Sequence, residues 1–168
     1  MTTKELTMSE ETQAPQPQFG MKRIYLKDAS LECPGVPAIF NQQWAPAVNL
    51  EVNTKNAQLD ENHFEVTLVL TVNVKVGEET AFLIEVHQAA IFLISGFEPA
   101  QMHHTLGAYC PNLLFPYARE AVDNLAVRAS FPALMLQQVN FDALYQQKLQ
   151  QLMEQHKAEQ SESAEATE

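Results

Sequence analysis

Apolar and polar side chains alternate most clearly between positions 64 and 76. Apolar residues occupy every second position from Phe64 to Val76, and polar residues fill most positions between them. A period of two over this length predicts a β-strand with one buried and one solvent-facing side. A short segment, Gly77-Glu78-Glu79, follows, and residues 80–95 are again rich in β-branched and aromatic side chains. The two segments therefore predict a β-hairpin.

The second arm of this hairpin has two different faces. One parity is apolar and includes Phe82 and Ile84, whereas the other parity holds Leu83, Glu85 and His87. If pairing starts near positions 76 and 80, the apolar parity shares the face of Val72. Leu83 and Glu85 then join the polar face of the first arm, with Thr71 and Asn73.

Two weaker strands precede the hairpin. Val48, Leu50 and Val52 alternate with polar residues, and residues 23–33 alternate less regularly. In the segment 23–33 we expect an inward set, Tyr25, Ala29, Leu31 and Cys33, and an outward set, Asp28, Ser30 and Glu32. The connection between these strands, 36–46, carries Ile39, Phe40 and Trp44. It is unusually apolar, because surface connections are normally polar.

Helical periodicity replaces the strand pattern after position 96. Apolar residues recur at spacings of three and four between Leu114 and Leu125, which predicts an amphipathic helix. Pro111 and Pro116 should interrupt or kink its beginning, and Ser130-Phe131-Pro132 should end it.

A last helix should begin after Asn140, which resembles an N-cap residue. Its apolar stripe includes Phe141, Leu144 and Tyr145. Strands followed by helices predict the α+β class. We expect a four-stranded antiparallel sheet packed on one face by a long interrupted helix and a C-terminal helix.

The ends of the 168-residue chain differ from its middle. Residues 1–18 and 154–168 are polar and lack the apolar side chains that would offset the entropy of ordering them. We therefore expect a disordered N-terminal extension over 1–18, a single domain over 19–153 and an acidic, mobile C-terminal tail over 154–168.

The net charge of −11 at pH 7 narrows the classes of partner. Such a chain repels nucleic-acid phosphates and anionic membranes, and it favours basic partners. No apolar stretch is long enough to cross a bilayer, and the N-terminus lacks the pattern of a signal peptide. Cys33 and Cys110 are too few for a disulfide framework, so we expect buried free thiols in an intracellular, reduced protein.

Candidate catalytic and metal-binding groups are sparse. His103-His104 with Cys110 matches no standard metal-ligand spacing. Glu85 and His87 share a strand face and could form an acid/base pair, but a solvated face explains both. Phosphate-binding loops and nucleophile motifs are missing from the sequence. We therefore expect no enzyme, no metal and no cofactor.

Three features have two interpretations each. The aromatic loop with Phe40 and Trp44 either folds onto its own core or contributes to a binding groove. The stripe of the last helix is either core or groove. The polar sheet face with Asp28, Glu32 and Glu85 is either merely solvated or a docking surface. Together they favour a binding protein with apolar grooves and an acidic surface.

One long block resembles a known family. Residues 106–120, Leu-Gly-Ala-Tyr-Cys-Pro-Asn-Leu-Leu-Phe-Pro-Tyr-Ala-Arg-Glu, resemble the signature block of the SecB protein-export chaperones. Three shorter segments, 23–28, 77–83 and 140–144, resemble further blocks of that family. The likeness covers roughly residues 19–153. The first 18 residues look longer than usual for the family, and the tail matches only in acidity.

This resemblance implies a fold, a function and partners. It implies a cytoplasmic homotetramer, a dimer of dimers with helices layered between two sheets. It implies ATP-independent holding of unfolded precursor proteins and their delivery to the SecA motor. A chaperone of the same fold that serves another client, such as a toxin–antitoxin system, is the alternative.

The resemblance also implies two sets of site residues. The groove for unfolded peptide would comprise Ile39, Phe40, Trp44, Phe141, Leu144 and Tyr145. The docking site for the zinc-bearing C-terminal segment of SecA would comprise Asp28, Glu32, Leu83 and Glu85. The zinc would belong to the partner.

Overall fold

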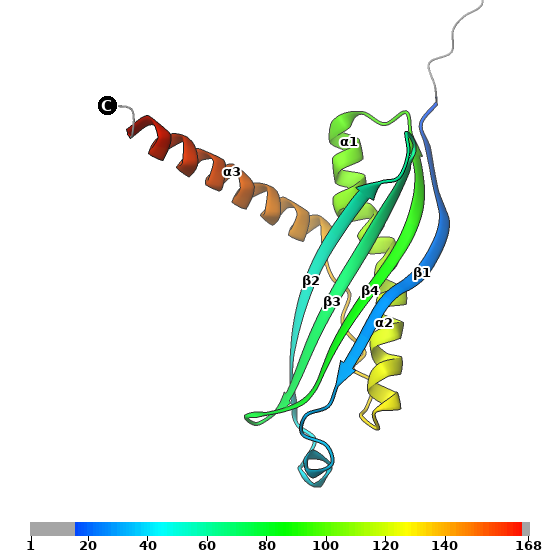
Figure 1. The fold of residues 1–168 in the computed structure, drawn as a ribbon, viewed down its shortest axis with the longest axis vertical. Helices are drawn as coiled ribbons and strands as arrows, with labels where there is room; N and C mark the ends of the chain where they lie inside the picture. The colour runs from blue at the N-terminus through cyan, green and yellow to red at the C-terminus, as the bar shows by residue number, and fades with distance from the viewer. Residues whose placement is uncertain (1–15, 166–168) are drawn as a thin grey trace, which may run out of the picture.

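A long antiparallel sheet forms the centre of the computed structural model, which describes the backbone of residues 16–165 and the side chains of residues 16–157. Its strands are β1 (Gln18–Glu32), β2 (Pro46–Gln58), β3 (His63–Val76) and β4 (Glu79–Ser95). They lie in the order β1-β4-β3-β2, so β1 and β2 are the two edges (Figure 1). The predicted N-terminal extension falls largely outside the described residues.

The β3–β4 hairpin confirms the strongest sequence prediction. Gly77 takes a φ of 58° in its turn, a left-handed conformation that glycine adopts without steric cost. Val72 pairs with Ile84, and Asn73 pairs with Leu83. The apolar parity is therefore buried against the core, and the polar parity faces the other side of the sheet, as the alternation predicts.

A register shift in β1 changes which side chains point inward. Beyond the shift between Leu26 and Asp28, Leu31 pairs with Ile84 and Asp28 pairs with His87, so the predicted directions are confirmed there. Before the shift, Tyr25 pairs with Ala89 and its hydroxyl donates to Glu65 on the far side of the sheet. The inward prediction for Tyr25 is wrong, because one extra residue at a β-bulge reverses the alternation.

One long interrupted helix covers the apolar face of the sheet, as predicted. It consists of α1 (Pro99–His104), a π-helical turn (Thr105–Tyr109) and α2 (Cys110–Arg128), with Pro116 inside α2. It begins earlier than the apolar spacing indicates. α2 packs on β3 and β4 (Figure 1). The largest fully buried side chains in this layer are Phe82, Phe92, Phe115, Leu68, Leu70 and Ile84.

The C-terminal helix α3 (Phe141–Glu165) leaves the body of the molecule (Figure 1). Asn140 caps it, because its Oδ1 accepts the N–H of Ala143 at 3.0 Å. The helical backbone continues past residue 153, where the apolar stripe of the sequence ends. Across the described part of the chain, helices combining the length and apolar character needed to cross a bilayer are absent.

Candidate functional site

Four aromatic rings gather where the connection between β1 and β2 meets the end of α2; we call them the aromatic cluster. The centroid of Phe131 lies 4.8 Å from that of Phe82, 5.2 Å from that of Phe40 and 5.5 Å from that of Trp44. Phe82 and Phe131 are buried, whereas Phe40 is 47% exposed and Trp44 is 36% exposed. Two solvent-facing rings therefore rest on two core rings.

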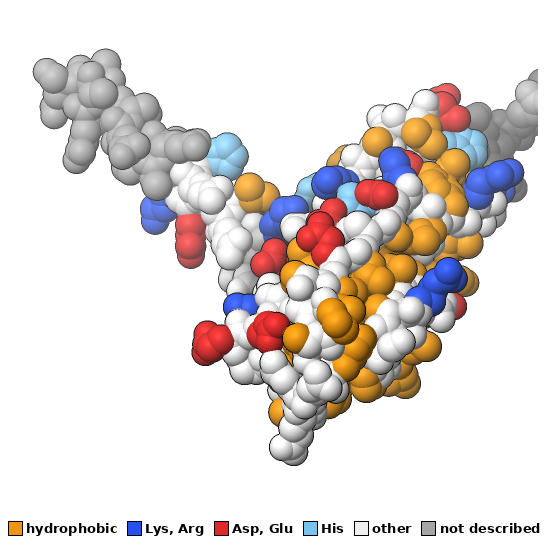
Figure 2. Space-filling model, turned by 60° about the horizontal axis from the view of Figure 1, so that its bottom comes forward, with side chains coloured by type: hydrophobic (Ala, Val, Ile, Leu, Met, Phe, Trp, Pro, Cys, Tyr) orange, Lys and Arg blue, Asp and Glu red, His pale blue; other side chains and the backbone are white. Residues whose placement is uncertain are grey.

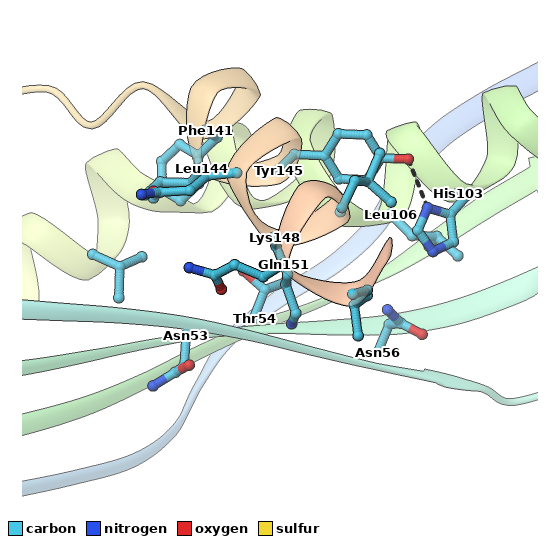
Figure 3. A pocket seen from close by; sticks show the side chains of 15 residues that line it. Asn53, Thr54, Asn56, His103, Leu106, Phe141, Leu144, Tyr145, Lys148 and Gln151 are labelled. Carbon is cyan, nitrogen blue, oxygen red and sulfur yellow. Dashed lines mark hydrogen bonds between the residues drawn. The ribbon is translucent and has the colours of Figure 1, made fainter. Parts of the chain in front are cut away.

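A second apolar surface lies between β2 and α3. A pocket of about 470 Å³, here called the helix pocket, opens between them (Figure 3). Its apolar lining comes from β2, the π-helical turn and α3, and comprises Val52, Leu106, Phe141, Leu144, Tyr145, Leu149 and Leu152. Lys148 and Gln151 lie between the helix and β2 (Figure 3). Such a mixed lining can contact apolar side chains and hydrogen-bond a peptide backbone.

The first turns of α3 are held to α1 by two histidines. Nδ1 of His103 lies 2.6 Å from the hydroxyl of Tyr145, and Nε2 of His104 lies 2.7 Å from Oδ1 of Asp142. The ring of Tyr145 also lies directly against Gly107. The sequence pattern favours packing or surface roles for this histidine pair over a metal site, but it does not predict these contacts with α3. In the described chain, clusters of three or more His, Cys, Asp or Glu suited to a metal ion do not occur.

The six expected groove residues thus lie in two places. Phe40 and Trp44 belong to the aromatic cluster, whereas Leu144 and Tyr145 line the helix pocket. Ile39 and Phe141 are buried, at 3% and 4% exposure, and both pack within the core, although Phe141 also lines the helix pocket. Contacts with a bound peptide would therefore fall to the exposed members of each set.

The side of the sheet opposite α2, here called the outer face, brings together the expected docking residues. Asp28 pairs with His87, and Glu32 pairs with Leu83. Glu85 lies between these two rows on β4. The two strands that share these residues are neighbours, so the four side chains form one surface.

Further polar groups on the outer face adjoin this surface. Glu51 on β2 pairs with Thr71, which itself pairs with Glu85, so a second carboxylate lies in the same row. The amide of Asn73 lies beside Leu83, and its buried Oδ1 has no hydrogen-bond partner among the described residues. Asn73 was predicted on this face with Leu83 and Glu85, whereas Glu51 was not, because the alternation alone sets no register between β2 and β3.

The surroundings of Glu85 favour its ionised form. Nε2 of His87 lies 2.8 Å from its Oε1, and the Thr71 hydroxyl donates to its Oε2 at 3.3 Å. The hydrogen bond with His87, together with smaller effects that include Lys55, lowers the pKa of Glu85. The carboxylate is therefore ionised at neutral pH and 45% exposed to a partner.

The other half of the outer face holds a hydrogen-bonded network around Glu65. Nζ of Lys27 donates to Glu65 at 2.7 Å, and the Tyr25 hydroxyl donates to the same carboxylate. These bonds, that of Lys27 first, lower the pKa of Glu65. Burial, with the hydrogen bond to Glu65, raises the pKa of Tyr25 to about 12. This network joins the bulged segment of β1 to β3.

Hydrophobic side chains also remain uncovered elsewhere. Figure 2 shows them gathered over the body of the molecule, with acidic side chains alongside. On the long helix, Tyr109, Tyr117 and Val127 are about half exposed. Tyr117 lies within the predicted amphipathic segment between Leu114 and Leu125, yet it is exposed, so the side of α2 directed away from the sheet carries apolar as well as polar side chains.

Comparisons with known proteins agree on one family. A family model described as preprotein translocase subunit SecB matches residues 12–152. A protein-export protein SecB of Pseudomonas syringae pv. tomato is 60% identical over 138 residues, covering 82% of this chain and 84% of the relative. One from Pseudomonas fluorescens is 56% identical over 152 residues, covering 90% and 94%.

A solved structure has a similar fold. It is a SecB-like chaperone of Mycobacterium tuberculosis in complex with a ChAD peptide from an antitoxin. The TM-score is 0.62 at 18% identity, over 72% of this chain and 90% of that chain. Identity this low supports similarity of fold alone.

Proposed function

The chain belongs to the SecB family of protein-export chaperones, and from that premise we propose how its surfaces hold and deliver precursor proteins. Relatives 56–60% identical carry the name of export chaperones. This favours precursor proteins as clients over the antitoxin alternative. The proposed activity is holding of unfolded chains without ATP in the cytoplasm, and it requires no bond to be made or broken.

Client holding is assigned to the aromatic cluster and the helix pocket. The observation that carries this proposal is the pair of exposed rings, Phe40 and Trp44, resting on the buried ring of Phe131. An extended segment would place its apolar side chains against these rings and against Leu144 and Tyr145, and polar groups of the helix pocket would bind its backbone. Each contact can be weak, because several sites on one assembly raise the effective concentration of the next segment.

Delivery is assigned to the outer face. Asp28, Glu32 and Glu85 would attract a basic module, and Leu83 would supply an apolar contact. The partner proposed is the zinc-bearing C-terminal segment of SecA, with the zinc held by SecA. The unpartnered acceptor of Asn73 beside Leu83 supports this proposal, because a partner donor there would satisfy it.

Assembly is assigned to the uncovered side of the long helix. We propose a homotetramer, a dimer of dimers, in which helices lie between two sheets. The exposed Tyr109, Tyr117 and Val127 support this arrangement, because a helix layer between sheets would remove them from water. Light scattering measures the mass directly, and a monomer at micromolar concentration would contradict this part of the proposal.

Client holding can be tested through one fluorophore. Trp44 is the chain's only tryptophan. A short, tryptophan-free peptide with apolar and basic residues is titrated into the protein, and the Trp44 emission is followed. We expect a saturable change whose midpoint rises in Phe40→Ala and stays the same in Glu85→Lys. Peptide binding detected by anisotropy without any change in Trp44 emission would contradict the assignment.

A further inference from the structure

One histidine lies inside the proposed docking surface. His87 is on β4, two residues from Glu85, and its Nε2 lies 2.8 Å from Glu85 Oε1. Across the strand pair it faces Asp28 on β1. Its side chain is 22% exposed. The imidazole therefore contacts one carboxylate assigned to SecA docking, and a second one, Asp28, occupies the paired position on the neighbouring strand.

The remaining neighbours of His87 on the outer face include two charged side chains, Glu51 and Lys55. On β3 it faces Val69, which pairs with Asn53 on β2. The next row towards Glu85 contains Thr71 and Glu51. The next row on the other side of His87 contains Thr67 and Lys55. The adjacent cation on β1, Lys27, is already bound to Glu65. Among these neighbours, His87 carries the one imidazole, the side chain whose charge changes near neutral pH.

We propose that His87 sets the electrostatic strength of the docking surface, binding Glu85 as an internal cation when protonated and leaving it free for a basic partner when neutral. An imidazole changes charge between pH 5 and 8, where carboxylates and lysines do not. In the neutral form its N–H only orients the Glu85 carboxylate, which keeps its full charge. When His87 is protonated, it competes with the lysines and arginines of the partner for the Glu85 carboxylate.

The inference rests on the proposed docking of SecA and adds a regulating residue to it. Long-range attraction to an acidic surface controls the association rate, and charges on that surface change this rate most. One partly exposed opposite charge is worth a change of roughly 1.4-fold to fivefold in affinity. We therefore expect docking to weaken by about that factor between pH 8 and pH 6.

The test compares His87→Gln with the unaltered chain. A glutamine amide can still donate to Glu85, but it carries no charge at any pH. The zinc-loaded C-terminal segment of SecA is titrated into each full-length protein at pH 8 and pH 6, at low ionic strength. We expect the two proteins to bind alike at pH 8, and His87→Gln to bind more tightly at pH 6. Titration of the SecA segment itself affects both proteins equally and cancels in this comparison.

Two controls separate the possible failures. His63→Gln removes another strand histidine, which lies 2.8 Å from Asp60 outside the docking rows, and it should keep the pH dependence of the unaltered chain. Glu85→Gln at pH 8 tests the docking site itself. If Glu85→Gln weakens binding but His87→Gln keeps the original pH dependence, the role of His87 is contradicted alone. If Glu85→Gln has no effect, the docking proposal and the inference fall together.

Folding of His87→Gln is checked by circular dichroism, and His87→Asn serves as a second uncharged variant. If neither variant folds, the unaltered chain decides the question through an NMR titration of the His87 ring with and without the SecA segment. We expect the bound segment to disfavour protonation of the ring. Equal titration curves in the free and bound protein would overturn the inference.

Discussion

Gly107 lies against Tyr145 so closely that a Cβ at position 107 would come within 2.7 Å of Cδ2 of the tyrosine ring. This contact joins the π-helical turn to the first turns of α3. The same tyrosine approaches His103 through its hydroxyl, at 2.6 Å. The position of the first turns of α3, and with it the shape of the helix pocket, therefore depends on position 107 being a glycine.

Gly107→Ala should displace the Tyr145 ring and loosen α3. Overpacking of this kind costs roughly 1–3 kcal/mol, which exceeds the gain in helix propensity from alanine. We expect a lower free energy of unfolding in urea and weaker peptide binding in the helix pocket. Gly20→Ala is the matched control, because a Cβ at position 20 would meet no atom within 4 Å. Equal unfolding of the two variants would contradict the proposed role of this contact.

Trp44→Ala and Phe40→Ala should weaken client binding with little effect on assembly. Both rings are substantially exposed, whereas the rings they rest on are buried. Removing either ring should therefore reduce the affinity for a bound peptide more than the stability of the fold. A groove aromatic is worth on the order of 1–3 kcal/mol at its site. A short peptide measured by calorimetry is the best probe, because avidity masks losses with a full precursor. Leu59→Ala, which removes an exposed apolar side chain from the β2–β3 connection, should bind as the unaltered chain does.

Glu85→Lys or Asp28→Lys should weaken docking of the zinc-loaded SecA segment by at least about threefold, because each reverses a charge on the outer face. Folding, assembly and client holding should be unchanged. The difference should shrink as salt rises, since charges more than about 8–10 Å apart are screened near physiological ionic strength. Glu78→Lys, at the hairpin turn, makes the same charge change away from the site. An affinity equal to that of Glu78→Lys would remove the tested residue from the docking surface.

Acid should destabilise the β-bulge through Glu65. The pKa of this carboxyl is lowered by Lys27 first and Tyr25 second, so the ionised form contributes stability above its usual pKa of 4.5. That stability is lost as pH falls through the lowered value. Glu65→Gln should lower the free energy of unfolding by about 1 kcal/mol at neutral pH and reduce the further loss in acid.

Urea unfolding at several pH values from 7 to 3 measures this effect. Glu61→Gln, in the β2–β3 connection, is the control for removing a carboxylate from the same part of the chain. If Glu65→Gln loses stability in acid as steeply as the control, the network is not what stabilises the bulge.

The sequence predicted the hairpin because its alternation and its glycine turn define the same register. The bulge in β1 could not be predicted, since Lys27 is an ordinary strand residue and only pairing with β4 reveals the extra position. The inward assignment of Tyr25 failed for that reason. The early start of the long helix was also missed, because residues 105–109 form a π-helical turn that departs from the regular α-helical period.

The candidate sites were predictable to different degrees. Asp28, Glu32, Leu83 and Glu85 share the outer face because two neighbouring strands alternate strictly in that region. The aromatic and helical groove residues resemble one another in type, but the fold separates them into two surfaces. Glu51 and His103 depend on long-range pairing and on helix docking, which no local pattern encodes.

Client holding is tested most directly by the refolding of a precursor. A reduced, unfolded precursor protein is diluted into buffer with and without the chaperone, in the absence of nucleotide, and its refolding rate is measured. We expect the rate to fall markedly at one proposed tetramer per precursor, because binding of the unfolded state withdraws it from folding. Trp44→Ala should restore part of the rate. A refolding rate at this ratio equal to that of the precursor alone would contradict the proposed function.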